Sequence, residues 1–149
     1  GSSRGYIYSR SIPMLKDTIF LGYGPDTYSI TFPQDDLLGK VIAYQTTGKV
    51  VDKPHCMYLQ MGINTGLLSL IAALFMFGLY FFDSFLIYFR EEYNDLMSNV
   101  GLGIFLGFTG YCIAGVFNDS IVSVAPVFWV LYGMGMAINQ YIKNGRKKL

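Results

Sequence analysis

The sequence predicts an all-α membrane protein, with about three transmembrane helices after an N-terminal loop region that carries short helices. Of its 149 residues, 52% are hydrophobic and only 14% are charged, whereas soluble domains average about 25% charged. Three uncharged, mostly apolar runs cover residues 61–82, 96–117 and 121–142, and about 20 such residues cross a ~30 Å hydrocarbon core. A soluble core rarely needs three such runs. We therefore divide the chain into a loop region, 1–60, and a membrane region, 61–149.

Lysine and arginine near the ends of the runs predict the orientation, because cytoplasmic segments are enriched in them. Arg90 follows the first run. The C-terminal tail carries four more basic residues, Lys143, Arg146, Lys147 and Lys148. On the opposite side only Lys49 and Lys53 lie close to a run. We therefore expect the tail in the cytoplasm, and residues 1–60 outside the membrane together with the turn at 118–120.

Polar residues and one proline at the run ends each have a structural interpretation. Asp83 lies near the inner end of the first run, and we favour an interfacial position over an intramembrane function, with the helix continuing beyond it. Pro126 either kinks the third helix or lies in its first turns. Asp119 or Ser120 is expected to cap that helix, as short oxygen-bearing side chains do.

The outer region combines a helical start with a long irregular stretch. Residues 4–21 fit a short amphipathic helix interrupted near Pro13, which Gly22 and the following residues end. Residues 26–54 show no helical periodicity, and irregular stretches of this length are often functional. Asp35 and Asp36 have oxygens that suit a divalent cation, but with no third ligand nearby we favour a turn cap.

Three residues of the outer region are candidates for chemistry. His55, the only histidine, is a candidate general base or acid, because an unperturbed histidine titrates near working pH. The alternative is a hydrogen-bonding residue at the membrane surface. Arg4 and Arg10 are candidate ligands for phosphate oxygens, which a guanidinium contacts bidentately. The alternative is that they pair with Asp17 and Asp26 or extend towards the headgroups.

Composition excludes two other classes of site. The net charge is +1, and the basic stripe typical of nucleic-acid binders is absent. Cys56 and Cys112 lack the C-x-x-C spacing of zinc ligands, and one histidine does not complete a zinc set with them. We therefore expect neither nucleic acid nor a metal. Whether the two cysteines form a disulfide stays open.

Two stretches, GSSRGYIYSRSIPMLKDTIFLGYGPDTY and VVDKPHCMYLQMGINTGLLSL, resemble the C-terminal part of the O-antigen ligase/polymerase family of bacterial membrane glycosyltransferases. The residues that match the family pattern, in order, are Arg4, Tyr8, Gly22, Gly24, His55, Tyr58, Leu59 and Gly66. The FNDS turn at 117–120 is similar to one in Gram-positive members. Cys56 departs from the Asn or Ser that is usual after the histidine, and position 8 is often tryptophan in the family.

The resemblance implies glycan transfer from an undecaprenyl-pyrophosphate donor at the outer face of the bacterial cytoplasmic (inner) membrane, without a cofactor. The acceptor would be a glycan or a glycolipid, and the resemblance does not separate ligase from polymerase. Arg4 and Arg10 would bind the pyrophosphate, with Arg4 also catalytic, and His55 would activate the acceptor hydroxyl. Since the family has further upstream helices, we expect this chain to be part of a longer polytopic protein and inactive alone. The alternative is a non-catalytic membrane module of a polysaccharide export or assembly complex.

Overall fold

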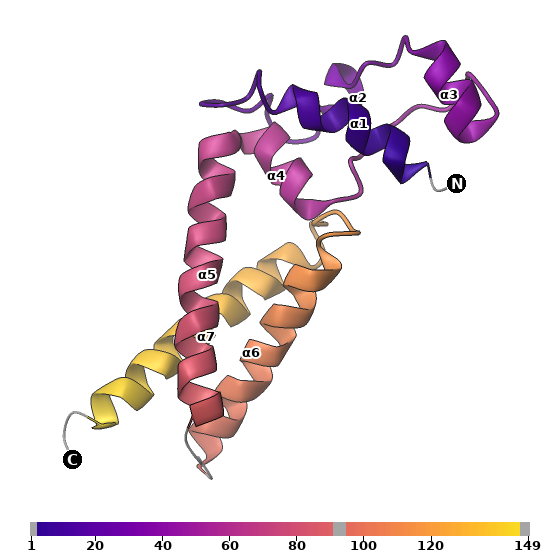
Figure 1. The fold of residues 1–149 in the computed structure, drawn as a ribbon. Coiled ribbons are helices and arrows are strands. Elements are labelled where there is room, and N and C mark those ends of the chain that lie inside the picture. The colour runs from indigo at the N-terminus through magenta and orange to yellow at the C-terminus, as the bar shows by residue number, and fades with distance from the viewer. Residues whose placement is uncertain (1–2, 91–94, 147–149) are drawn as a thin grey trace. The chain divides into compact units, whose positions relative to one another are not determined.

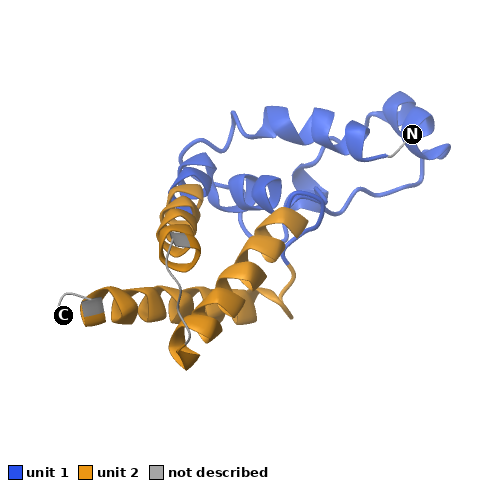
Figure 2. Ribbon diagram, turned by 60° about the horizontal axis from the view of Figure 1, so that its bottom comes forward, with its two compact units in different colours: residues 1–73, 115–120 blue, residues 74–114, 121–149 orange. Residues whose placement is uncertain are grey.

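All regular elements that the structure describes are helices, which Figure 1 shows in chain order. The structure is a computed structural model that describes residues 3–90 and 95–146, and no strand occurs within these ranges. The chain divides into two compact units, distinguished by colour in Figure 2. Unit 1 comprises residues 1–73 with 115–120, and unit 2 comprises the remainder.

Unit 1 contains four short helices and the first turns of a fifth. The four are α1 (Arg4–Met14), α2 (Tyr28–Thr31), α3 (Leu37–Tyr44) and α4 (Met57–Thr65). Their shared core consists of Ile7, Met14, Tyr28, Phe32, Val51 and Ile63. Ser11 is buried in this core and donates to the carbonyl oxygen of Ile7 at 2.7 Å, and its Oγ lies 2.6 Å from the Tyr28 hydroxyl. Because the serine has one proton to give, the tyrosine donates, and both buried hydroxyls are satisfied.

The outer region differs from the sequence prediction in two places. The helix predicted over 4–21, with an interruption near Pro13, ends at Met14 and does not resume. From Leu15 to Asp17 the backbone N–H groups donate three residues back, in turns rather than in an α-helix. The stretch 26–54 was predicted without helices and contains α2 and α3. The sequence of α3 shows no amphipathic periodicity, because the charged residue Lys40 is buried while the apolar residues Leu38 and Ile42 are exposed.

The first apolar helix begins six residues later than predicted. Gly66 has φ +105°, a conformation that glycine adopts without steric cost, and it separates α4 from α5 (Leu67–Arg90). The predicted span of 61–82 therefore merges the end of one helix with most of another. The segment of α5 that is long and apolar enough to cross a membrane is Leu67–Phe89.

Unit 2 contains the rest of α5, together with α6 (Leu96–Ala114) and α7 (Ala125–Arg146). By length and composition, α6 is the second helix able to cross a membrane. The helix predicted over 96–117 begins at the predicted residue and ends at Ala114, three residues before the predicted end. The third span, predicted over 121–142, is not confirmed, because α7 begins at Ala125 and is not apolar enough. Its second half includes the polar residues Asn139, Gln140, Lys143 and Asn144.

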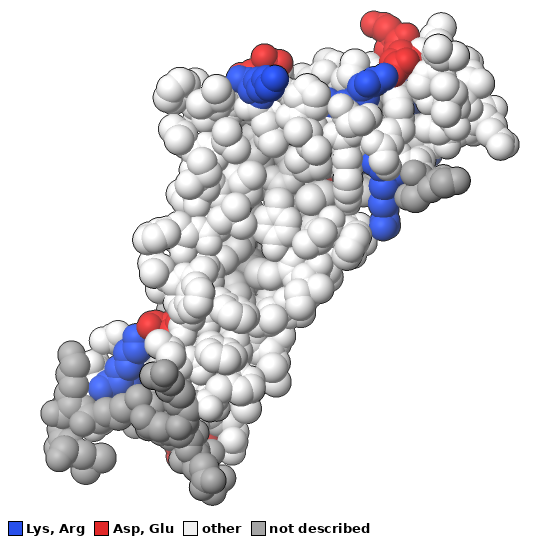
Figure 3. Space-filling view, in the orientation of Figure 1, with Lys and Arg blue, Asp and Glu red and all other residues white. Residues whose placement is uncertain are grey.

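Aromatic rings from all three helices form the core of unit 2. Phe108 of α6 stacks on Phe128 of α7 at 5.7 Å between ring centroids and meets Tyr80 of α5 edge-on at 4.8 Å. Phe77 meets Tyr132 edge-on at 5.8 Å. Such arrangements add about 0.5–1.5 kcal/mol per pair beyond the buried area. The face of unit 2 drawn in Figure 3 is largely uncharged.

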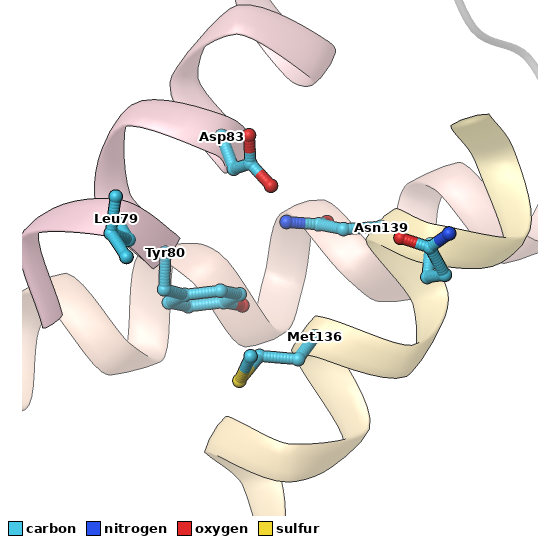
Figure 4. A pocket seen from close by; sticks show the side chains of 6 residues that line it. Leu79, Tyr80, Asp83, Met136 and Asn139 are labelled. Carbon is cyan, nitrogen blue, oxygen red and sulfur yellow. The ribbon is translucent and has the colours of Figure 1, made fainter. Parts of the chain in front are cut away.

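A polar network joins α5 to α7 within unit 2. The Asn139 amide donates to Ser84 Oγ at 2.8 Å and accepts from the Tyr88 hydroxyl at 2.8 Å. Asp83 forms an ion pair with Lys143, and Figure 4 shows Asp83 and Asn139 at a cavity of about 250 Å³. As predicted, the helix continues beyond Asp83, but the aspartate also has a cationic partner that the sequence did not indicate.

Candidate functional site

A carboxylate from a distant part of the chain contacts His55. Nδ1 of His55 lies 3.1 Å from Oδ2 of Asp119. Oδ1 of the same carboxylate accepts a hydrogen bond from the N–H of Cys56 at 3.3 Å. The Asp119 side chain is 7% exposed, whereas the His55 side chain is 47% exposed. A buried carboxylate therefore orients the imidazole from one side, and the ring remains accessible to a substrate.

The backbone on both sides of this pair is fixed by hydrogen bonds to α4. His55 has φ +52°, in the left-handed region that few non-glycine residues adopt. Immediately afterwards α4 begins, and the N–H of Met57 donates to the carbonyl oxygen of Gly115 at 2.8 Å. The N–H of Ser120 donates to Oε1 of Gln60 at 2.8 Å. The segment that carries the carboxylate is thus attached to α4 at both ends.

Tyr8 and Arg4, both on α1, lie at the same site. The Tyr8 hydroxyl is 3.0 Å from the carbonyl oxygen of His55 and 3.2 Å from that of Val116. Burial raises the pKa of the Tyr8 phenol, and the positive charge of Arg4 opposes that rise. Arg4 is exposed at the start of α1, close enough for its charge to act on this phenol. Arg4 lies one helical turn before Tyr8 on α1, and the Tyr8 hydroxyl in turn contacts the backbone of His55.

His55 also borders a cavity of about 310 Å³ in unit 1. The other residues that line it are Ser3, Ile7, Tyr44, Lys49, Val50, Val51 and Asp52. Ligand pockets in proteins span about 300–1,000 Å³, so this cavity has the size of a small subsite. Lys49, which the sequence analysis counted only as a charge near a run, contributes a cation to its wall.

Arg10, the third predicted site residue, has a structural partner instead. Its Nε and Nη2 donate to Oδ2 of Asp36 at 2.9 and 2.7 Å. Oδ1 of the same carboxylate accepts from the N–H of Gly39 at 2.9 Å, so Asp36 caps the helix α3, where the sequence analysis expected Asp35 and Asp36 to cap a turn. The Gly39 N–H first, and then Arg10, hold the pKa of Asp36 below its ordinary value. Arg10 thus joins α1 to α3, and its partner is neither Asp17 nor Asp26.

Within residues 3–90 and 95–146, the His, Cys, Asp and Glu side chains form no group of three or more that would hold a metal ion. Cys56, which is buried, and Cys112 both carry thiols in the structure.

Asp119 is the functional candidate that sequence reasoning missed. We expected Asp119 or Ser120 to cap the third helix, but α7 begins only at Ala125 and the Asp119 carboxylate contacts His55 instead. The signal that could have identified it is its predicted side of the membrane, since the 118–120 turn and residues 1–60 were both assigned outside. A buried acid near a histidine in sequence-distant segments has no local motif, so spacing alone did not reveal the pair.

Comparison of the chain with models of protein families, with curated proteins and with solved structures finds no match. Its function therefore has to be inferred from the chemistry of its residues. The features available are the His55–Asp119 pair, the neighbouring cations and two helices able to cross a membrane.

Proposed function

We propose that the chain is part of a bacterial membrane glycosyltransferase of the O-antigen ligase/polymerase type, which transfers a glycan from an undecaprenyl-pyrophosphate donor to an acceptor glycan or glycolipid. The observation that carries the proposal is the contact between His55 and the buried carboxylate of Asp119. The resemblance of the sequence supplies the reaction class, and the contact supplies a base suited to that reaction.

His55 is the general base in this proposal. With Asp119 as the partner of Nδ1, the neutral ring carries its proton on Nδ1 and keeps the lone pair of Nε2 for a substrate. Nε2 takes the proton of the acceptor hydroxyl as that oxygen forms a bond to the anomeric carbon of the donor. The bond from this carbon to the pyrophosphate oxygen breaks in the same step. Asp119 is a positioning residue, since it stabilises the imidazolium that results.

Cations at the site assist departure of the pyrophosphate. The leaving group gains negative charge as its bond to the sugar breaks, and fixed positive groups stabilise that charge. Arg4 provides a guanidinium close to Tyr8, and Lys49 provides an ammonium in the cavity that His55 borders. Arg10 forms an ion pair with Asp36. In this proposal Lys49, rather than Arg10, therefore binds the pyrophosphate together with Arg4.

The membrane placement agrees with this chemistry. If α5 and α6 both cross the bilayer, the chain returns to the side from which it entered, so residues 1–60 and the 115–120 segment share one side. The contact between His55 and Asp119 requires that arrangement. The basic residues of the tail favour the cytoplasm for the C-terminus, and this orientation requires α7 to cross as well, although it is less apolar than α5 and α6. The site then lies outside, where the lipid-linked donor presents its pyrophosphate at headgroup depth.

The test measures transfer from a lipid-pyrophosphate glycan donor by the whole protein in membranes, for variants His55→Ala and Arg4→Ala. We expect a loss of at least a hundredfold for His55→Ala, since general base catalysis contributes about 10²–10⁴-fold. Arg10→Ala is the matched control, because the same charge is removed from a structural contact. Normal transfer by both site variants, inserted normally in the membrane, would support the non-catalytic module instead.

A further inference from the structure

Three consecutive apolar residues of unit 1, Ile19, Phe20 and Leu21, are exposed. Their exposed fractions are 43%, 76% and 82%. We call them the 19–21 triplet. Full exposure of a large apolar side chain costs about 1.5–3 kcal/mol relative to burial, so three in succession indicate a surface that has an apolar partner.

Backbone hydrogen bonds attach the triplet to the start of α5. The carbonyl oxygen of Thr18 accepts from the N–H of Leu67 at 2.7 Å, and that of Ile19 accepts from the N–H of Leu68 at 3.2 Å. These donors belong to the first turn of α5, where backbone N–H groups have no partner inside the helix. Thr18 is fully buried. The triplet is therefore fixed beside the first turn of the apolar helix.

The length of α5 determines the depth of that turn. Its apolar segment, Leu67–Phe89, has 23 residues, and at 1.5 Å per residue this is about 34 Å. The hydrocarbon core of a bilayer is about 30 Å thick. If α5 crosses the bilayer, its first turn lies at the membrane surface. Leu68 and Ile71, on the first turns of the same helix, are 52% and 54% exposed, so the apolar surface continues from the helix to the triplet.

We propose that the 19–21 triplet inserts into the interfacial layer of the bilayer and anchors unit 1 to the membrane. Its partner is lipid at the boundary between headgroups and acyl chains. Lys16 and Asp17, separated from the triplet by the buried Thr18, are exposed, as expected where the chain enters the headgroup layer from water. The proposal rests on α5 crossing a bilayer, and it is independent of glycosyl transfer.

The experiment measures lipid contact by tryptophan fluorescence. Phe20→Trp is made in the whole protein, in a background whose native tryptophans, Trp129 included, are replaced by Phe, and is reconstituted into phosphatidylcholine vesicles with or without brominated acyl chains. We expect blue-shifted emission and a loss of intensity in brominated lipid. Leu21→Trp, at the more exposed neighbour, repeats the measurement if the first variant does not fold.

Two further tryptophan positions make the result decisive. Thr47→Trp, at an exposed polar residue of the same unit, is expected to show red-shifted emission without quenching by brominated lipid. Ile71→Trp on α5 tests the crossing itself. Quenching of Ile71→Trp without quenching of Phe20→Trp or Leu21→Trp would overturn the anchor and leave the membrane helix intact. Absence of quenching at all three positions would overturn both.

Discussion

Asp119→Asn is the most informative change at the site, because it removes one charge and keeps the size of the side chain. The new amide oxygen still accepts from the N–H of Cys56, which Oδ1 now does at 3.3 Å. The amide nitrogen replaces the oxygen that now lies 3.1 Å from His55 Nδ1. Since that nitrogen is a donor, it favours the ring form with the Nδ1 lone pair exposed and the proton on Nε2. This is the wrong form for a base that acts through Nε2.

The size of the effect follows from the hydrogen bond that is lost. A hydrogen bond to a charged group contributes about 1.5–3 kcal/mol, and each 1.36 kcal/mol changes a rate about tenfold. The variant should therefore lower kcat/KM by about ten to 150-fold. Because the His55 side chain is 47% exposed and water weakens the interaction, we expect the lower part of that range.

The assay is transfer from a lipid-pyrophosphate glycan donor in membranes, measured beside His55→Ala and a control, Asp35→Asn. The control makes the same chemical change at an exposed carboxylate of unit 1 and should keep the wild-type rate. A wild-type rate for Asp119→Asn together with an inactive His55→Ala would refute the orienting role of Asp119. A rate for Asp119→Asn below that of His55→Ala would show that the carboxylate itself takes part in transfer.

Three further predictions concern the fold of unit 1. Gly66→Ala places a side chain at φ +105° and should destabilise the protein by about 1–3 kcal/mol. Gly5→Ala in α1, with open space around the new methyl group, should instead stabilise it by up to about 1 kcal/mol. Thermal unfolding in detergent compares the two variants. Ser11→Ala removes the partner of the buried Tyr28 hydroxyl and should cost about 1–3 kcal/mol, and adding Tyr28→Phe should recover part of that loss in the same assay. The pKa of Asp36 lies below its ordinary 3.8 in the folded protein, so its cap stabilises α3 above about pH 3.8 and is lost as the pH falls through the lower, folded value. The amide NMR shift of the capped residue reports this loss, and Asp36→Asn should abolish its pH dependence.

The sequence predicted the helical class and, approximately, the two apolar helices α5 and α6, because long uncharged runs depend on composition rather than on tertiary contacts; the third span, over 121–142, is not confirmed. The continuation of α5 beyond Asp83 and the cap by Asp36 were also predictable, since both follow from local chemistry. The boundary at Gly66 was not, because a glycine inside an apolar run gives no sign of whether its φ is positive. Counting apolar residues over about 20 positions does not detect a helix boundary inside the run.

The site was only partly predictable. His55 is the one histidine and precedes an apolar run, so its candidacy follows from residue type and place. Its partner Asp119 is 64 residues away, and only the folded chain shows which of several aspartates contacts the imidazole. The partner of Arg10 could not be predicted for the same reason. The sequence suggested the nearby acids Asp17 and Asp26, whereas the folded chain pairs Arg10 with Asp36.

The central claim is that the surface of unit 1 carrying His55 faces away from the cytoplasm. Thr47→Cys, in a background whose native cysteines, Cys56 and Cys112 included, are replaced by serine, places a single reactive thiol at an exposed position of that unit. A membrane-impermeant maleimide should label it fully in intact spheroplasts. Labelling only after the membrane is permeabilised would put His55 and Asp119 in the cytoplasm and contradict the proposed transferase.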